Sequence, residues 1–312
     1  MHLGLTPWDM TPTTMAEQAR LAEGWGYESI WLPENHFSGQ FAVPDPLLLL
    51  ASMAGATETI RLATTSFLLP LRHPLQAAEQ VAVLDQVSNG RLILGLGRGY
   101  QKPTYAAFGI AMRQKREIFA QTLTTMRRAW AGEELVMLEG ADPVRLAPLP
   151  IQQPHPPLWV AAFGPKALAQ VGSLGLPYLA SPVESVDALR ANYAALNDAC
   201  VEAGHQPPEV VPVMRSMYVS TDAAEVRALR ERLSDAIAAQ AKGGPAHLQK
   251  AAEANVDDIA IVGEPGFVRD QVARYVDDLG VTHLIATRLR LSGIPVEKLR
   301  LSTQRLAEIL VR

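Results

Sequence analysis

The chain has one cysteine and no long apolar run, and each shortage excludes a class of protein. Cys200 stands alone among 312 residues, so no disulfide can form within the chain. Its place in a helical pattern indicates a small buried side chain rather than a reactive thiol. No apolar run approaches the roughly 20 residues of a membrane-spanning helix, and the first residues lack the basic-then-apolar plan of a signal peptide. We therefore expect a cytoplasmic protein that has no membrane partner.

Blocks of like charge are also missing. The 28 basic and 32 acidic residues give a net charge of -4 and are spread along the whole chain. Such a distribution offers no electrostatic footprint for nucleic acid or for anionic lipid. A small molecule is the expected partner.

The motifs of metal and nucleophile chemistry are absent as well. The seven histidines show no HxH or HExxH spacing, and one cysteine cannot make a Cys-x-x-Cys pair. No GxSxG or SxxK motif indicates a nucleophilic serine. We expect no metal and predict that a cofactor supplies the chemistry, while a metal site assembled from several strand ends remains an alternative.

Strand and helix patterns alternate along the sequence. Apolar strands are expected at 2–5, 28–33, 60–69, 91–97, 157–162, 176–181, 210–219 and 281–287. Helices are expected at 13–24, 46–57, 75–88, 114–131, 166–174, 185–203, 222–241, 266–279 and 296–311. This alternation, with no break in composition, predicts an α/β fold in which residues 1–312 form a single (β/α)8 TIM barrel domain with insertions.

Two weakly periodic stretches are candidates for the insertions between the strands and helices of the barrel. Residues 132–156 are rich in proline, and residues 242–258 open on a Gly-Gly-Pro signal; both are candidate lids. An open doubly wound sheet is the competing fold. The GxGxxG fingerprint of that fold is absent from the sequence, because the glycines at 95, 97 and 99 alternate at the end of a strand.

Polar residues follow several strands at their C-terminal ends, where parallel α/β folds place their sites. Glu34, Asn35 and His36 follow the second strand, and Arg72 lies past the third. Alternatively, Glu34 pairs with a neighbouring base and His36 bonds within its loop. The hydroxyl residues Thr64, Thr65 and Ser66 lie in the third strand. Their small size could let a flat ring approach the backbone closely. Alternatively, the threonines are there only because threonine favours β-strands.

The ends of the fourth and fifth strands suggest an anion site. Arg98, Gly99 and Tyr100 follow the fourth strand, and Gly164, Pro165 and Lys166 open a helix after the fifth. Free N–H groups at a helix N-terminus attract anions, and arginine binds phosphate through charge-assisted hydrogen bonds. Arg98 with residues 164–166 is therefore a candidate phosphate cradle.

The sequence resembles the bacterial luciferase-like flavin monooxygenases over about residues 3–182, and more loosely beyond. The matching segments are LAEGWGYESIWLPENHF, ATETIRLATTSFLLPLRHPLQAAEQVAVLDQVSNGRLILGLGRGY followed by AFGI, LWVAAFGPKALAQVGSLGLPYLASP and, loosely, IVGEPGFVRDQVARYVDDLGVTHLIA. The resemblance implies a (β/α)8 barrel that uses reduced FMN and O2, or the deazaflavin F420 without O2. It also implies a homodimer.

The resemblance also implies roles for single residues. Arg98 corresponds to the arginine that holds the FMN phosphate, and Gly164, Pro165 and Lys166 to the turn that completes this site. Thr65 and Ser66 match a pair joined by a non-proline cis peptide bond beneath the flavin ring of luciferase, so we expect a cis or distorted bond between them.

Two departures separate the chain from luciferase itself. Asn35 stands where luciferase has the histidine that supports catalysis, so only the second histidine of that motif survives, as His36. Gly97 stands where luciferase has a cysteine at the flavin. These changes argue against light emission and an aldehyde substrate, but not against flavin binding.

The leading hypothesis is a monooxygenase that takes FMNH2 from a separate reductase and uses O2 to oxygenate a small organic substrate. His36 and Asn35 are the expected catalytic residues; Thr65, Ser66, Arg98, Gly99, Tyr100, Gly164, Pro165 and Lys166 are expected to bind the cofactor. An F420-dependent oxidoreductase, in which His36 gives or takes a proton, is the alternative. A flavin-binding protein without catalysis is the third hypothesis.

Overall fold

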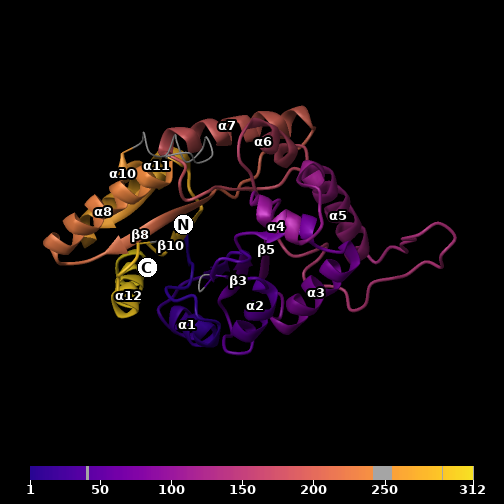
Figure 1. Ribbon diagram of the computed structural model, residues 1–312, viewed down its shortest axis with the longest axis horizontal. Coiled ribbons are helices and arrows are strands. Elements are labelled where there is room, and N and C mark those ends of the chain that lie inside the picture. The colour runs from indigo at the N-terminus through magenta and orange to yellow at the C-terminus, as the bar shows by residue number, and fades with distance from the viewer. Residues whose placement is uncertain (40–41, 242–254, 290, 312) are drawn as a thin grey trace. The chain divides into compact units, whose positions relative to one another are not determined.

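The computed structural model describes residues 1–39, 42–241, 255–289 and 291–311 (Figure 1). These residues form two compact units. Unit 1 contains Met1–Asp9, Leu21–Trp31 and Val160–Arg312, and unit 2 contains Met10–Arg20 and Leu32–Trp159. Helix α1 (Met15–Gly24) and the strands β2 (Ser29–Leu32) and β6 (Leu158–Ala161) have residues in both units.

The strands of unit 1 pair in parallel. β1 lies between β2 and β10, β10 pairs with β8, and β8 pairs with β9; β6 pairs with β7. The bounds not yet given are β1 His2–Leu5, β7 Tyr178–Leu179, β8 Pro212–Val219, β9 Ala260–Gly263 and β10 His283–Thr287. β9 and most of β8 and β10 are buried, as strands covered on both faces of a parallel sheet are.

The helices of unit 1 alternate with its strands, except that α10 comes between α8 and β9. They are α6 Pro165–Gly172, α7 Val186–Glu202, α8 Ala223–Ala241, α10 Val256–Ile259, α11 Pro265–Leu279 and α12 Val296–Leu310. α6 packs so closely on α7 that a Cβ at Gly172 would lie only 2.5 Å from the Cβ of Ala199. Cys200, on the same part of α7, is fully buried, and burial raises the pKa of its thiol. The prediction of a small buried side chain is confirmed.

Unit 2 has a smaller parallel arrangement. β5 (Leu92–Gly97) pairs in parallel with β3 (Arg61–Thr64) and, further along, with β4 (Phe67–Leu68). Every residue of β5 is buried. The α-helices are α2 Pro46–Ala54, α3 Pro74–Val87, α4 Lys102–Ala107 and α5 Lys115–Trp130, with short 3-10 helices at Pro12–Thr14, Leu69–Leu71 and Met112–Gln114.

The helices of unit 2 cover its strands. α2 packs on β3 and on α3, and α3 packs on α5 (Figure 1). The buried indole of Trp130 donates to the carbonyl of Ala78 at 3.0 Å, which joins α5 to α3. Pro74 begins α3, and Asn89 and Gly90 follow its end with φ of 54° and 74°, a conformation that asparagine and glycine adopt most readily.

The predicted parallel α/β organisation is confirmed, whereas closure into one barrel and a single domain over 1–312 stay predictions. The strand expected at 60–69 is two strands, β3 and β4, interrupted at Thr65 and Ser66. The sequence analysis did not predict α4, α10 or β9.

The structure describes the first candidate lid completely and the second only in part. Residues 132–156 contain an antiparallel bridge between Leu135 and Val144 but no longer helix or strand. Residues 242–254 of the second candidate lie outside the described residues, and α10 begins just after them. In the described ranges, no helix combines the length and the apolar character needed to cross a membrane.

Candidate functional site

Glu34 follows β2 in unit 2 and is bound to three groups. Its Oε1 accepts a hydrogen bond from Nε2 of His36 at 2.8 Å and forms an ion pair with the Arg72 guanidinium at 2.8 Å. Its Oε2 accepts the backbone N–H of Leu68 at 2.9 Å. The Glu34 side chain is fully buried. The structure thus brings together two residues that the sequence placed at different strand ends, Glu34 and Arg72.

Asn35 holds the loop that carries His36. Its backbone forms an antiparallel bridge with Val43, and its side-chain oxygen accepts the Val43 N–H at 3.1 Å. This oxygen therefore fixes the loop, while the expected catalytic role of Asn35 stays a prediction.

Two phenylalanines lie against His36. The His36 ring meets Phe108 edge to face, with centroids 5.0 Å apart, and contacts Phe37 at 5.8 Å. Phe37 is 70% exposed, and its φ of 56° is rare for a bulky residue. Its exposure and its conformation make Phe37 a candidate for the functional surface. The sequence reasoning did not assign these phenylalanines to the site, although both lie in the quoted motifs ENHF and AFGI.

Thr65 and Ser66 lie between β3 and β4, and the peptide bond between them is cis, as predicted. Thr64 donates its hydroxyl to the carbonyl of Gly95 at 2.7 Å, which ties β3 to β5. A Cβ at Gly97 would lie 2.0 Å from Oγ and 2.8 Å from Cβ of Ser66. The glycine at position 97 is therefore required by the space that Ser66 occupies.

Gly97→Ala should accordingly destabilise the protein by about 1–3 kcal/mol, the usual cost of overpacking a close contact. Ser66→Gly in the same chain removes both clashing atoms and should restore most of the loss. Chemical denaturation of the two single variants and the double variant measures this coupling. If the two changes destabilise additively, Ser66 is not what excludes a side chain at position 97.

Arg98 lies directly after β5 and is 7% exposed. Its guanidinium lies over the Phe119 ring at 5.3 Å, and its carbonyl accepts the Tyr105 hydroxyl. Burial, and then the charge of Arg116, lowers the pKa of Arg98 to about 10, against a small opposing effect of Tyr105.

Lys115 adds a third cation at this point. Its Nζ donates to the carbonyl of Gly99 at 3.1 Å. Burial lowers the pKa of Lys115, and the charges of Arg98 and Arg116 lower it further. Arg98 is buried, Lys115 is half-buried and Arg116 is exposed, and an anion stabilises cations that lie this close together. Sequence reasoning named only Arg98, because the other two begin a helix that reads as an ordinary amphipathic one.

The other residues that the sequence predicted to bind the cofactor are divided between the two units. Gly99 has φ of 68°, and Tyr100 is largely exposed; both belong to unit 2. Gly164, with φ of 78°, caps the N-terminus of α6, which begins at Pro165 and continues with the exposed Lys166 in unit 1. A phosphate cradle made of Arg98 and residues 164–166 stays a prediction.

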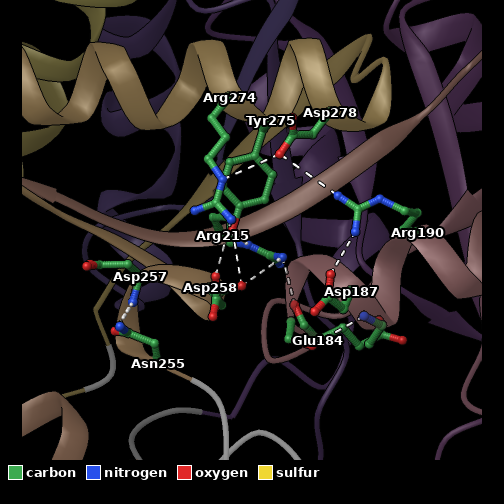
Figure 2. Close-up of polar contacts among 12 residues, drawn as sticks. Glu184, Asp187, Arg190, Arg215, Asn255, Asp257, Asp258, Arg274, Tyr275 and Asp278 are labelled. Carbon is green, nitrogen blue, oxygen red and sulfur yellow. Dashed lines mark hydrogen bonds and ion pairs between the residues drawn. The ribbon is translucent and has the colours of Figure 1, made fainter.

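Figure 2 shows a second polar cluster, in unit 1, around the fully buried Arg215 of β8. Arg215 donates to the Tyr275 hydroxyl at 2.6 Å and to the backbone carbonyls of Glu184 at 2.7 Å and Asp258 at 3.4 Å. Arg274 extends the cluster by ion pairs to Asp258 and to Asp278. These bonds connect α11 with the segments that follow β7 and precede β9, so the cluster stabilises the fold of unit 1.

Glu184, in the same cluster, has a raised pKa. Burial raises it, while hydrogen bonds from the Tyr178 hydroxyl at 2.5 Å, the Ser181 N–H at 2.6 Å and the Asn192 amide at 2.7 Å oppose the rise. Its carboxylate oxygens thus have partners within unit 1. Sequence reasoning missed this cluster, because Arg215 lies inside an apolar strand rather than at its end.

Comparison with known proteins shows which family the chain is similar to. A family model described as luciferase-like monooxygenase matches residues 2–283. The oxygenase component of a flavin-dependent trigonelline monooxygenase from Acinetobacter baylyi is 29% identical over 66% of this chain and 59% of that protein. More generally, the chain spans about half to two thirds of the length of the curated relatives it matches.

Two solved structures are similar over almost their full lengths. A monooxygenase from Streptomyces bottropensis has a TM-score of 0.81 and 25% identity, covering 100% of this chain and 99% of that one. The F420-dependent tetrahydromethanopterin reductase of Methanopyrus kandleri has a TM-score of 0.74 and 19% identity, covering 99% and 98%, which shows likeness of fold alone.

Proposed function

Because the chain belongs to the luciferase-like monooxygenase family, we propose that it is a flavin-dependent enzyme that uses FMNH2 and O2 to oxygenate a small organic substrate. The observation that carries this proposal is the buried Arg98 at the end of β5, which lies near the half-buried Lys115 and the exposed Arg116 at the start of α5. The trigonelline relative is named as the oxygenase component of a flavin-dependent monooxygenase, which supports a separate reductase as partner.

The residues of unit 2 fit a flavin phosphate. Burial of Arg98 and partial burial of Lys115, close to Arg116, favour an anionic ligand, and a phosphate accepts charge-assisted hydrogen bonds from both residue types. In this proposal Arg98, Gly99 and Tyr100 hold the phosphate end, completed by Gly164, Pro165 and Lys166. Thr65 and Ser66 lie beneath the ring.

The chain's own residues then have distinct tasks. Bound reduced FMN supplies the electrons that activate O2. His36, held by Glu34, gives or takes a proton beside the substrate, and Asn35 orients the substrate. Phe37 and Phe108 lie next to the His36 ring and are exposed, so they are available to contact an apolar part of the substrate.

We also propose the larger assembly. The strands of the chain close into one (β/α)8 barrel domain over residues 1–312, and two chains form a homodimer in the cytoplasm. The family membership and the full-length likeness to a monooxygenase structure support the barrel.

Titration of the purified protein with FMN, FMNH2 and F420 tests the cofactor. We expect FMNH2 to bind and F420 not to bind, as followed by absorbance and fluorescence. The reaction of FMNH2 with O2 should change rate when protein is added. Binding of F420 alone, with turnover that needs no oxygen, would instead identify an F420-dependent oxidoreductase. Flavin binding with no change in that rate would indicate a binding protein without catalysis.

A further inference from the structure

Glu34, His36 and Arg72 form a buried cluster in unit 2, which we call the Glu34 cluster. Oε1 of Glu34 lies 2.8 Å from Nε2 of His36 and 2.8 Å from the Arg72 guanidinium. Exposure of the side chains is 0% for Glu34, 7% for His36 and 17% for Arg72. Charged groups so far removed from water are costly unless they are paired, so the pairing lowers the cost of burying them.

The carboxylate is fixed from two sides. Oε2 accepts the backbone N–H of Leu68 at 2.9 Å, and the Arg72 guanidinium lies 4.4 Å from the centre of the Phe67 ring. Leu68 and Arg72 belong to one short segment after β3, so the same segment holds both oxygens of Glu34. A carboxylate beside a guanidinium accepts hydrogen bonds and does not donate them.

The cluster therefore determines which ring nitrogen of His36 carries the proton. Because Glu34 only accepts, Nε2 of His36 must be the donor of the 2.8 Å bond, which leaves Nδ1 unprotonated in the neutral ring. Within the described residues, Nδ1 of His36 has no hydrogen-bond partner. The edge-to-face contact with Phe108 fixes the plane of the ring. The nitrogen that remains available is therefore Nδ1.

We propose that Glu34 and Arg72 are positioning residues that hold His36 as the Nε2–H tautomer, so that Nδ1 is the atom that accepts or returns the proton during oxygenation. The inference rests on the proposed function only in assigning a proton-transfer role to His36. Glu34 and Arg72 act through the imidazole and contact neither substrate nor cofactor. A carboxylate that orients a histidine and fixes its tautomer is a general device of acid–base catalysis.

NMR of the cofactor-free protein, labelled with 15N-histidine, tests the tautomer without any assay of activity. His36→Gln identifies the His36 signals among those of the seven histidines. The wild-type ring should show a protonated Nε2 and an unprotonated Nδ1. In Glu34→Gln the amide can donate as well as accept, so the ring should become a mixture of tautomers. A wild-type ring protonated at Nδ1 overturns the proposal, and so does a Glu34→Gln ring that keeps the Nε2–H form.

Arg72→Met provides a second variant in case Glu34→Gln does not fold. Methionine keeps much of the length of the side chain and an apolar contact to Phe67, but removes the cation. We expect the His36 signals to shift and broaden, because Glu34 loses the partner that fixes it. Glu17→Gln is the matched control, because it removes an exposed carboxylate that pairs with Arg20 at 2.6 Å. Sharp, unshifted His36 signals in Arg72→Met contradict a positioning role of Arg72.

Kinetics then separate positioning from a merely structural role. Glu34→Gln should lower kcat roughly 10- to 100-fold, as loss of an orienting partner does, with cofactor affinity within a few fold of wild type. Glu34→Gln added to His36→Ala should cause no further loss, because Glu34 acts through the imidazole. Additive losses contradict the proposal. If His36→Ala alone leaves turnover unchanged, the proposed role of His36 fails, whereas the NMR result still decides the tautomer.

Discussion

His36→Ala should lower turnover by roughly 100- to 10,000-fold, the effect typical of losing an acid–base group, and leave cofactor affinity within a few fold. The reason is geometric. His36 lies in the loop that follows β2. Its ring donates to Glu34 and packs edge to face with Phe108, so the imidazole has a fixed position. Single-turnover kinetics with reduced flavin, together with a flavin titration, measure the two quantities separately.

His2→Ala is the matched control for this experiment. His2 also pairs with a glutamate, Glu28, but both side chains are about half exposed, at 56% and 51%. An exposed pair of this kind contributes little, so turnover and stability should remain near those of wild type. Unchanged turnover in His36→Ala would return His36 to a role in holding its loop, with Glu34 as a structural partner.

Arg98→Ala should weaken binding of FMN or FMNH2 by about 1.5–3 kcal/mol, the contribution of a charge-assisted hydrogen bond, while riboflavin binding barely changes. The expectation rests on the buried Arg98 at the end of β5, where burial and the nearby charge of Arg116 lower the pKa of Arg98 to about 10. Because riboflavin lacks the phosphate, the difference between the two ligands isolates the phosphate contact. Both dissociation constants must be measured at one salt concentration, because screening weakens ion pairs.

Arg128→Ala serves as the control for Arg98. Arg128 lies on α5, as Lys115 and Arg116 do, but it is half exposed and pairs with Glu133 at 2.6 Å. It should change neither affinity. An equal loss of riboflavin and FMN binding in Arg98→Ala would mean that Arg98 supports the fold or the ring, and the phosphate assignment would have to be abandoned.

The sequence by itself determined the class of fold and the ends of the strands that carry polar residues. Apolar runs such as that of β5 and the three- and four-residue spacing in α3 are local patterns, and local patterns suffice for elements of ordinary length. The same patterns place Glu34, His36 and Arg98 just after strands. The cis bond at Thr65 and Ser66 followed from resemblance, since no local pattern of residue types encodes it.

Only the tertiary structure decided which of these residues meet. Arg72 reaches Glu34 from the segment after β4, and Lys115 and Arg116 come near Arg98 from the start of α5, so packing brings together segments that are separate in the sequence. The burial of Glu34 and Arg98 and the available nitrogen of His36 depend on this packing, and the exclusion of a side chain at Gly97 by Ser66 depends on the pairing of β4 with β5. Strand register is a property of the packed sheet, so short-range sequence patterns do not specify these contacts.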